Sequence, residues 1–319
     1  MERYQVLEKI GEGTFGVVMR ARNTETGKIV ALKKIRLRRL EEGIPNNMMR
    51  EIKALQQLDH PNVIKLFEVF PHGAGLVLVF DFMRCDLTEY LRASQRPLSA
   101  GEVKTCMLML LRGVAYMHAN DIMHRDLKPA NLFVSPTGEI VLGDFGLARV
   151  HLGQGVQYTQ QIATRWYRAP ENLFGARNYD TAVDMWAVGC ILAELLNNYP
   201  LFPGENDIDQ LYRVVSVLGN PDEIIWPGLS SLPDYGKINF SSTKPISLED
   251  IVPDADSNAT DLLKQLLVYD PKKRITAEKA LCHPYFFVDP LPGDLLLAPA
   301  LPKTTFVDWD LERPILFRP

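Results

Sequence analysis

Five short motifs carry residue types that could bind phosphate, hold a divalent cation and move a proton. A glycine-rich turn lets backbone amides come close to phosphate oxygens, and a lysine adds a fixed positive charge. Carboxylate and amide oxygens are the ligands that Mg²⁺ prefers, and a carboxylate can also accept a proton. In chain order the motifs are residues 11–16 (Gly-Glu-Gly-Thr-Phe-Gly), 30–33 (Val-Ala-Leu-Lys), 124–131 (His-Arg-Asp-Leu-Lys-Pro-Ala-Asn), 144–146 (Asp-Phe-Gly) and 169–171 (Ala-Pro-Glu).

The glycine frame is a weak signal when taken alone, because glycines also gather in tight turns for backbone reasons. Residues 4–10 before it and residues 17–21 after it alternate apolar with polar side chains, as half-buried strands do. A dinucleotide-binding fingerprint instead opens a helix, and no helix signal follows Val18. The flanks therefore predict a turn between two strands and argue against a dinucleotide site.

Length, charge and cysteine usage narrow the class of protein. The 319 residues are enough for one large domain or two lobes, and 46% of them are hydrophobic. The 35 Lys and Arg against 39 Asp and Glu give a net charge of −4, so we expect neither a nucleic acid nor a membrane as partner. No signal-peptide core or apolar span is visible, which predicts a protein of the cytoplasm or nucleus. The cysteines are too far apart for a zinc site and are expected to be reduced thiols: Cys85, Cys106, Cys190 and Cys282.

The apolar pattern divides the chain into a strand-rich part and a helix-rich part, which predicts an α+β fold of two lobes. The predicted strands are residues 4–10, 17–21, 29–35, 63–67 and 76–80, and one predicted helix lies among them at about 46–58. The later predicted helices are residues 101–118, 184–196, 207–218 and 260–268. We therefore expect a domain at 4–287, divided into an N-lobe at about 1–80, a hinge at 81–86 and a C-lobe at 87–287, and a tail at 288–319. A ligand cleft is expected at the junction of the lobes.

The joint occurrence of the five motifs, in this order and in these contexts, resembles the signature set of eukaryotic protein kinases. The resemblance covers roughly residues 4–287, and the Lys-Pro-Ala-Asn wording at 128–131 is similar to serine/threonine kinases. Residues 163–171 (Ala-Thr-Arg-Trp-Tyr-Arg-Ala-Pro-Glu) resemble the proline-directed branch, which includes cyclin-dependent and mitogen-activated kinases. The resemblance implies a bilobal kinase fold, with a small antiparallel-sheet N-lobe that carries one major helix and a larger, mainly helical C-lobe.

Closer likeness points to the cyclin-dependent group and, within it, to the cell-cycle-related kinase subfamily, at residues 38–46, 70–75 and 80–83. The chain departs from the cyclin-binding helix of that group at residues 46–48 and matches it at Gly43, Pro45, Arg50 and Glu51. The resemblance implies ATP and Mg²⁺ as cofactors, protein substrates with Ser/Thr-Pro sites, an upstream activating kinase and a cyclin or cyclin-like activator. Two alternatives stay open: a pseudokinase scaffold, and a mitogen-activated-type kinase without a cyclin.

The resemblance also gives each motif residue a role. Asp126 accepts or orients the proton of the attacking hydroxyl, and Lys128 neutralises charge on the transferred phosphoryl group. Lys33 binds the inner phosphates and is oriented by an ion pair with Glu51. The expected Mg²⁺ ligands are Asn131 and Asp144. The expected nucleotide-binding residues are Ile10, Gly11, Glu12, Gly13, Thr14, Phe15, Gly16, Val17, Val18, Ala31, Lys33, Phe80, Asp81, Met83, Asp86 and Phe133.

Two places differ from most relatives. Phe133 stands where many have leucine, and Gly143 stands where a larger residue is common. We expect the aromatic ring to pack beneath the purine and Gly143 to leave room behind Phe80. In the glycine loop, Thr14 is followed by Phe15, which has no acceptor hydroxyl, so Thr14 alone remains as an inhibitory phosphorylation site.

An activation switch is expected at Thr159, the position of the activating phosphothreonine in cyclin-dependent relatives. By the resemblance, three arginines converge on it: Arg50, Arg125 and Arg149. A phosphate with a charge of about −1.5 to −2 could bridge them and hold the helix glutamate toward the strand lysine. The alternatives are that Thr159 is an ordinary polar loop residue, or that the neighbouring Tyr158 is the acceptor.

Two residues near the motifs are interpreted as structural. The apolar neighbours of His124 suit burial, and Asp126 already fills the role of base. Cys85, in the hinge, has no neighbouring cluster of cations to activate its thiol. It is therefore expected to be an inert small residue.

Overall fold

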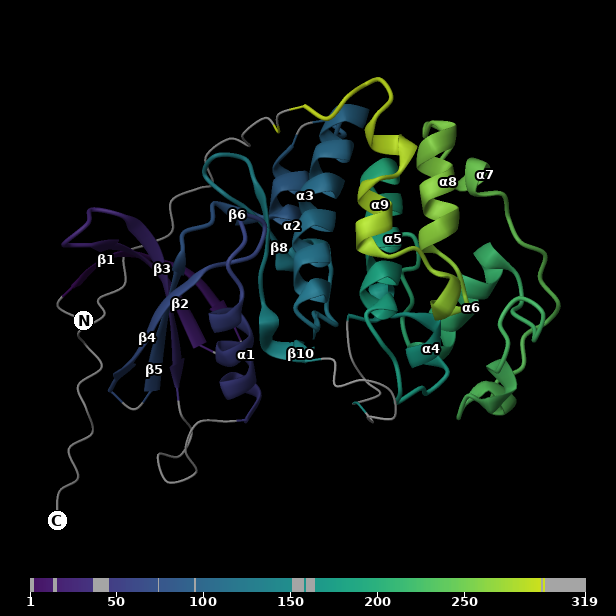
Figure 1. The fold of residues 1–319 in the computed structure, drawn as a ribbon, viewed down its shortest axis with the longest axis horizontal. Helices are drawn as coiled ribbons and strands as arrows, with labels where there is room; N and C mark the ends of the chain where they lie inside the picture. The colour runs from purple at the N-terminus through teal and green to yellow at the C-terminus, as the bar shows by residue number, and fades with distance from the viewer. Residues whose placement is uncertain are drawn as a thin grey trace, which may run out of the picture.

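The computed structural model describes residues 3–13, 16–36, 46–73, 75–94, 96–150, 158, 164–293 and 295. They form a strand-rich lobe and a helix-rich lobe that lie side by side (Figure 1). Helix α1 (Asn46–Gln57) lies between the large sheet and the helical lobe. The two-lobed α+β fold predicted from the sequence is confirmed.

Five antiparallel strands build the N-lobe sheet in the order β1-β2-β3-β5-β4. Their bounds are β1 Tyr4–Gly13, β2 Gly16–Asn23, β3 Ile29–Arg36, β4 Leu66–His72 and β5 Gly75–Asp81. The strand predicted at 63–67 was wrong in position. Val63 forms a parallel bridge with Leu142 instead, and the Ile64 amide donates to the Leu142 carbonyl at 2.8 Å. Val63 and Ile64 therefore connect the segment just before β4 to the C-lobe.

The two faces of this sheet pack differently because successive side chains of a strand point to opposite sides. On the outer face, Val30, Leu32, Val77 and Val79 form one buried cluster. On the inner face, a second cluster contains Ile35, Leu76 and Leu78 together with Ile52 of α1. Helix α1 thus covers the inner face through its apolar stripe, and this face also turns toward the other lobe.

Helices of very different length, from four to 20 residues, form most of the C-lobe. They are α2 Leu87–Ala93, α3 Ala100–Ala119, α4 Pro170–Leu173, α5 Ala182–Asn197, α6 Asp207–Leu218, α7 Leu248–Ile251, α8 Ser257–Leu266 and α9 Ala277–Leu281. The four helices predicted in this lobe are confirmed, α6 with its predicted bounds and the other three with shifted ends. The first turn of α8 escaped prediction because it is polar, and Asp256 caps it by accepting from the Asn258 and Ala259 amides. No helix in the described ranges is both long and apolar enough to cross a membrane.

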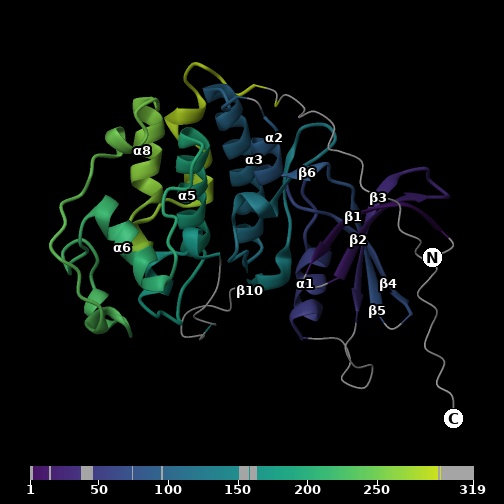
Figure 2. The same ribbon diagram turned by 180° about the vertical axis from the view of Figure 1, so that it is seen from behind.

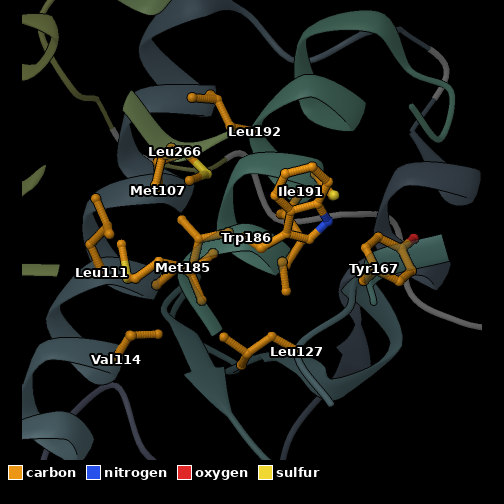
Figure 3. Close-up of a cluster of buried hydrophobic side chains, with 14 of the residues drawn as sticks. Met107, Leu111, Val114, Leu127, Tyr167, Met185, Trp186, Ile191, Leu192 and Leu266 are labelled. Carbon is orange, nitrogen blue, oxygen red and sulfur yellow. The ribbon is translucent and has the colours of Figure 1, made fainter. Parts of the chain in front are cut away.

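The C-lobe core lies where α5 meets α3 and α8 (Figure 3). Trp186 of α5 is completely buried, and its ring stacks on Phe202 with 5.9 Å between centroids. Met107 and Leu111 of α3 and Leu266 of α8 are buried beside it. Large side chains on three helices thus form a closely packed core. This core supports the shorter elements that carry the site residues.

Short elements connect this core to the cleft. The strands are β6 Cys85–Asp86, β7 Ile122–Met123, β8 Leu132–Val134, β9 Ile140–Leu142 and β10 Arg149–Val150. They form two small sheets, β6-β8-β9 and β10-β7, and single 3-10 turns accompany them, including η2 Pro129–Asn131, η3 Phe145–Leu147 and η4 Arg165–Tyr167. The sequence did not predict these elements, because two or three residues are too few to show a period.

Residues 288–293 pack on α3. Lys104 is completely buried and its Nζ donates to the Val288 carbonyl at 2.8 Å. Thr105 donates to the Gly293 carbonyl, and a Cβ on Gly101 would lie 2.9 Å from the Leu291 carbonyl oxygen. Both ribbon views show this segment, in yellow, crossing the end of α3 (Figure 2). The described part of the predicted tail is therefore a packed element.

Candidate active site

The inner face of the N-lobe sheet collects several residues expected to bind nucleotide. Gly11 lies opposite Val18, and Val18 lies opposite Lys33. Ala31 lies opposite Phe80 on the neighbouring strand. Directly opposed residues share a face, as do residues two apart in one strand, so these five residues line one surface. The strand register alone brings the lysine under the glycine hairpin.

The glycine hairpin closes through the pair Gly13 and Gly16, as the strand-turn-strand prediction requires. Gly16 has φ +144, and a Cβ there would lie 1.8 Å from the Lys34 carbonyl oxygen, so only glycine fits without distortion. Glu12 is exposed, and Ile10 is half-buried. Thr14 and Phe15 lie outside the described residues.

One nucleotide-binding assignment needs correction. Val17 packs with the outer-face cluster, beside Met19 and Val79. Its side chain points away from the face that carries Val18 and Lys33, because adjacent residues of a strand alternate in direction. The sequence pattern contained this information, since the glycine frame placed Val17 and Val18 on opposite sides.

Three of the expected nucleotide-binding residues lie in the hinge between the lobes: Asp81, Met83 and Asp86. Asp81 ends β5 and forms an ion pair with Lys28 at 2.8 Å, while Met83 is half-buried. Asp86 caps α2, since its carboxylate accepts from the Glu89 amide at 2.9 Å. Asp86 also lies directly opposite Phe133 in the β6-β8 pair. The residue that caps α2 and the residue that carries the aromatic ring are therefore neighbours.

Phe133 and Gly143 form a complementary pair across two strands. A Cβ built on Gly143 would lie 2.3 Å from Cε2 and 2.5 Å from Cδ2 of the Phe133 ring. The space left by the missing side chain at 143 is therefore taken by this ring, whereas the sequence-based expectation was room behind Phe80. The two departures from the usual residues compensate each other in volume.

A network of hydrogen bonds surrounds the Asp126 carboxylate. Lys128 Nζ donates to Oδ2 at 2.9 Å, and Asn131 Nδ2 donates to the same oxygen at 3.0 Å. Oδ1 accepts from the Thr164 amide at 2.8 Å and from its hydroxyl at 3.1 Å. These four bonds hold the carboxylate in a single orientation, and Asp126 is only 7% exposed.

Thr164 is a site residue that sequence reasoning missed. Besides its two bonds to Asp126, its hydroxyl accepts from Lys128 Nζ at 2.7 Å. It thus joins residues 36 and 38 positions away in the chain. The signal was its place before the Arg-Trp-Tyr-Arg run of the proline-directed motif, but a threonine there gives no sign of its partners.

Asn131 and Asp144 are placed to serve as hard oxygen ligands. Both hydrogen bonds of the Asn131 side chain use its amide nitrogen, which leaves the amide oxygen out of them. The Gly143 amide donates to the Asn131 carbonyl at 2.9 Å, so the strand before Asp144 is tied to η2. Asp144 is exposed and has the left-handed φ of 55, which presents its carboxylate at the end of β9. One carboxylate and one amide oxygen suit Mg²⁺, whose remaining ligands are usually waters and phosphates.

Asp184 anchors the loop that carries the catalytic residues, and sequence reasoning missed it too. Its Oδ2 accepts from the His124 amide at 2.9 Å and from His118 Nε2 at 2.9 Å, and Oδ1 accepts from the Arg125 amide at 2.7 Å. Burial alone would raise the pKa of Asp184, but the His118 hydrogen bond and the backbone donor outweigh it and lower that pKa. A lone Asp in the apolar α5 sequence was the available signal.

His124 is a core residue, as interpreted from the sequence. It is completely buried, its Nε2 lies 2.8 Å from the Gly143 carbonyl oxygen, and its ring packs on Phe145 at 5.1 Å. The Asp126 amide donates to His124 Nδ1 at 3.3 Å. This pattern fits the tautomer in which Nε2 carries the hydrogen and Nδ1 accepts. The ring thus connects the catalytic loop to Gly143, the residue before Asp144.

Arg125 already has protein partners. Its Nε donates to the Leu147 carbonyl at 2.7 Å, and Nη1 donates to the Tyr179 hydroxyl at 2.8 Å. Its backbone has a left-handed φ of 68, and the rings of Tyr158 and Tyr179 pack at a tilt of 41° with 5.2 Å between their centroids. Arg149 lies on β10, paired with Met123. The structure therefore brings two of the three expected arginines toward the same small sheet.

Several expected contacts fall outside the described residues. These include Thr159 itself and the side chains of Arg50 and Glu51, although their backbone belongs to α1. The ion pair between Lys33 and Glu51 and the arginine cluster around Thr159 therefore stay predictions. Helix α1 does pack against η3, the turn that follows Asp144. A movement of α1 would therefore also shift the segment that begins at Asp144.

Cys85 is an inert buried thiol, as interpreted from the sequence. It is 7% exposed, and burial raises its pKa to about 11. A thiol that stays protonated at neutral pH is a poor nucleophile.

Comparisons with known proteins agree with this geometry. The protein kinase domain family matches residues 4–286. Cyclin-dependent kinase 20 of Danio rerio is 60% identical over 295 residues, which cover 92% of this chain and 86% of that protein. The proteins of the same name from Rattus norvegicus and Homo sapiens are 58% and 56% identical over 295 residues, with 92% of this chain and 85% of each relative covered.

Proposed function

The chain belongs to the protein kinase family as a serine/threonine kinase of the cyclin-dependent type, and from this we propose that it phosphorylates Ser or Thr residues followed by proline. The observation that carries the proposal is the hydrogen-bond network around Asp126. In this network Asp126, the proposed base, is hydrogen-bonded to Lys128 and to Asn131, the proposed metal ligand, and all three are joined to Thr164 directly or through Asp126. Thr164 belongs to residues 163–171, which resemble the proline-directed branch of kinases.

The residues divide the work of phosphoryl transfer. Asn131 and Asp144 would hold the Mg²⁺ of bound ATP, which would supply the phosphoryl group. Asp126 orients the substrate hydroxyl and takes its proton, while Lys128, 2.9 Å from Asp126, offsets negative charge on the transferred group. Catalysis here depends mostly on position and charge, which a pre-formed network supplies without reorganisation.

Preference for proline after the acceptor follows from the likeness of residues 163–171 to the proline-directed branch. Proline has no backbone N–H, so it leaves no unpaired donor where a backbone carbonyl turns away. We further propose two controls. Phosphorylation of Thr159 orders the activation segment through Arg50, Arg125 and Arg149. A cyclin or cyclin-like activator binds the chain, as the names of the relatives suggest, and the likeness of residues 43–51 to a cyclin-binding helix favours α1 as its site.

The test is a transfer assay with purified protein, Mg²⁺ and labelled ATP. Matched peptides with Ser-Pro, Thr-Pro and Ser-Ala at the acceptor separate the proposed specificity from transfer in general. We expect label in the first two peptides and a loss of at least about 100-fold with Asp126→Asn, which removes the base but keeps the shape. Equal activity of wild type and Asp126→Asn would contradict the assignment, and equal labelling of Ser-Pro and Ser-Ala would contradict the proline preference.

The controls are tested in the same assay. Protein recovered from cells with its partners, and the same protein after their removal, show whether a cyclin-like activator is needed. Thr159→Ala is expected to lower the turnover number strongly, whereas Tyr158→Phe changes it little. If wild type with confirmed phosphate at Thr159 is no faster than Thr159→Ala, the segment is held by other contacts.

A further inference from the structure

A buried amide without partners lies beneath the segment that follows Thr164. Asn172 of α4 is 3% exposed, and within the described part of the chain neither its Nδ2 nor its Oδ1 has a hydrogen-bond partner. Among the described residues, Asn172 alone has two different buried side-chain polar atoms unmatched. Leaving such groups unpaired would cost about 1–3 kcal/mol each. The surroundings of Asn172 therefore need an explanation.

The amide borders a small cavity of about 10 Å³. Arg125, Tyr167 and Asp184 contribute polar side chains to its wall beside Asn172, and the rest of the lining is apolar: Leu127, Ala169, Val183 and Ala187. This volume is close to the lower limit of about 10–15 Å³ that one water molecule needs, and it is too small for an organic ligand. A buried water also needs two to four polar partners. The volume of the cavity and the polar groups in its wall therefore decide whether it can hold a water molecule.

The polar atoms around the cavity match one water molecule. Asn172 offers a donor and an acceptor, and Asp184 offers a carboxylate whose Oδ1 accepts from the Arg125 amide at 2.7 Å. A carboxylate oxygen can accept more than one hydrogen bond, and the lowered pKa of Asp184 keeps it an acceptor. Water has two hydrogens and lone pairs, so it can donate to both acceptors and accept from Nδ2.

We propose that this cavity binds one ordered water molecule, which links Asn172 of α4 to Asp184, the anchor of the catalytic loop. Asp184 holds the amides of His124 and Arg125, the two residues before the base. Asn172 lies directly after Pro170 and Glu171, and Glu171 is fastened by two bonds to the buried Arg274 at 2.9 and 3.1 Å. The water therefore joins two rigidly held segments, and Asn172 acts as a positioning residue through it.

The first test is a crystal structure of the full chain at a resolution that shows ordered water. We expect a density peak within hydrogen-bond distance of Asn172 and Asp184, and no peak in Asn172→Leu, which has nearly the same shape without polar atoms. An empty cavity in the wild type, or one filled by a moved side chain, would overturn the proposal.

The second test uses the sign of the change in Tm. If Asn172 holds a water, Asn172→Leu loses hydrogen bonds and lowers Tm by about 2–4 °C. If its amide were simply unpaired, the same change would remove a penalty and raise Tm. Asn62→Leu is the matched control, because Asn62 is 5% exposed and donates to the Ile140 carbonyl at 2.8 Å. This control must lower Tm under either explanation.

The third test separates positioning from stability. We expect Asn172→Leu to lower kcat for peptide phosphorylation several-fold at a temperature well below its Tm and to leave the KM for ATP unchanged. Asn172→Ser, which keeps a hydrogen-bonding group and leaves room for water, should recover most of the lost kcat. An unchanged kcat in Asn172→Leu despite loss of the water would overturn the positioning role. This arm uses the proposed Ser-Pro specificity only to choose the peptide, and the first two arms do not depend on it.

Discussion

Gly143→Ala should act on the nucleotide pocket through Phe133. The added Cβ would lie 2.3 Å from the ring, whereas ordinary contacts begin at 3.4 Å, so the ring or the strand must retreat by about 1 Å. The backbone of Gly143 is held on both sides, by Asn131 at 2.9 Å and by His124 at 2.8 Å. The ring is therefore the part that moves.

Overpacking of this kind costs about 1–3 kcal/mol. If about 1.4 kcal/mol of that is relieved only when the ring turns into the cleft, the Kd of Mg²⁺-bound ATP rises about tenfold. Phe133→Leu removes the ring and leaves a void, so it also changes nucleotide affinity. The double variant Phe133→Leu, Gly143→Ala restores the usual pairing of a smaller residue at 133 with a larger one at 143.

The assay is titration calorimetry with a non-hydrolysable ATP analogue on wild type, both single variants and the double variant. We expect the double variant to bind more tightly than Gly143→Ala alone, with a coupling free energy of about 1 kcal/mol or more. Gly236→Ala is the control, since a Cβ there would meet nothing within 4 Å. Additive effects of the two single variants would refute the claim that ring and glycine share one space.

Three further predictions concern the catalytic network and the C-lobe. Thr164→Val should lower kcat by about 10–100-fold with little change in the KM for ATP, because it removes the hydroxyl bonds to Asp126 and Lys128. Thr164→Ser keeps the hydroxyl and should have a kcat near that of wild type. An equal loss of kcat in both variants would contradict this reasoning. Glu102→Gln should destabilise the protein at pH 7. The Arg96 hydrogen bond lowers the pKa of Glu102 to about 2, so its stabilising effect is present above the unfolded pKa of about 4.5 and is lost as pH falls toward 2; urea unfolding of both proteins across that range should show the gap closing, and a constant gap would refute the reasoning. Lys104→Ala should lower the free energy of unfolding by about 2 kcal/mol and speed amide exchange in 288–293, because it removes the bond to Val288; unaltered exchange there would show that other contacts hold the segment.

The sequence by itself determined the chemistry and the classes of the main elements. Glycines between two alternating segments sufficed for the β1-β2 hairpin, because alternation reports which side of a strand is buried. The order of the motifs was enough to predict the kinase family, which the comparisons confirmed. Helix α6 was predicted with its observed bounds, since Asn206 is a strong N-cap and Gly219 follows the last residue.

Only the tertiary structure decided which distant residues meet. The bond between Asp126 and Thr164 and the bonds between Asp184 and the catalytic loop join segments that no local pattern relates. Val63 pairs with Leu142 across the lobes, although by itself its sequence favours a strand of the N-lobe sheet. Phe133 and Gly143 are unusual residues when taken singly, and their fit appears only when β8 and β9 are side by side. The physical reason is range: propensity and periodicity act over a few neighbouring residues, whereas hydrogen-bond partners and shared volume depend on how the layers pack.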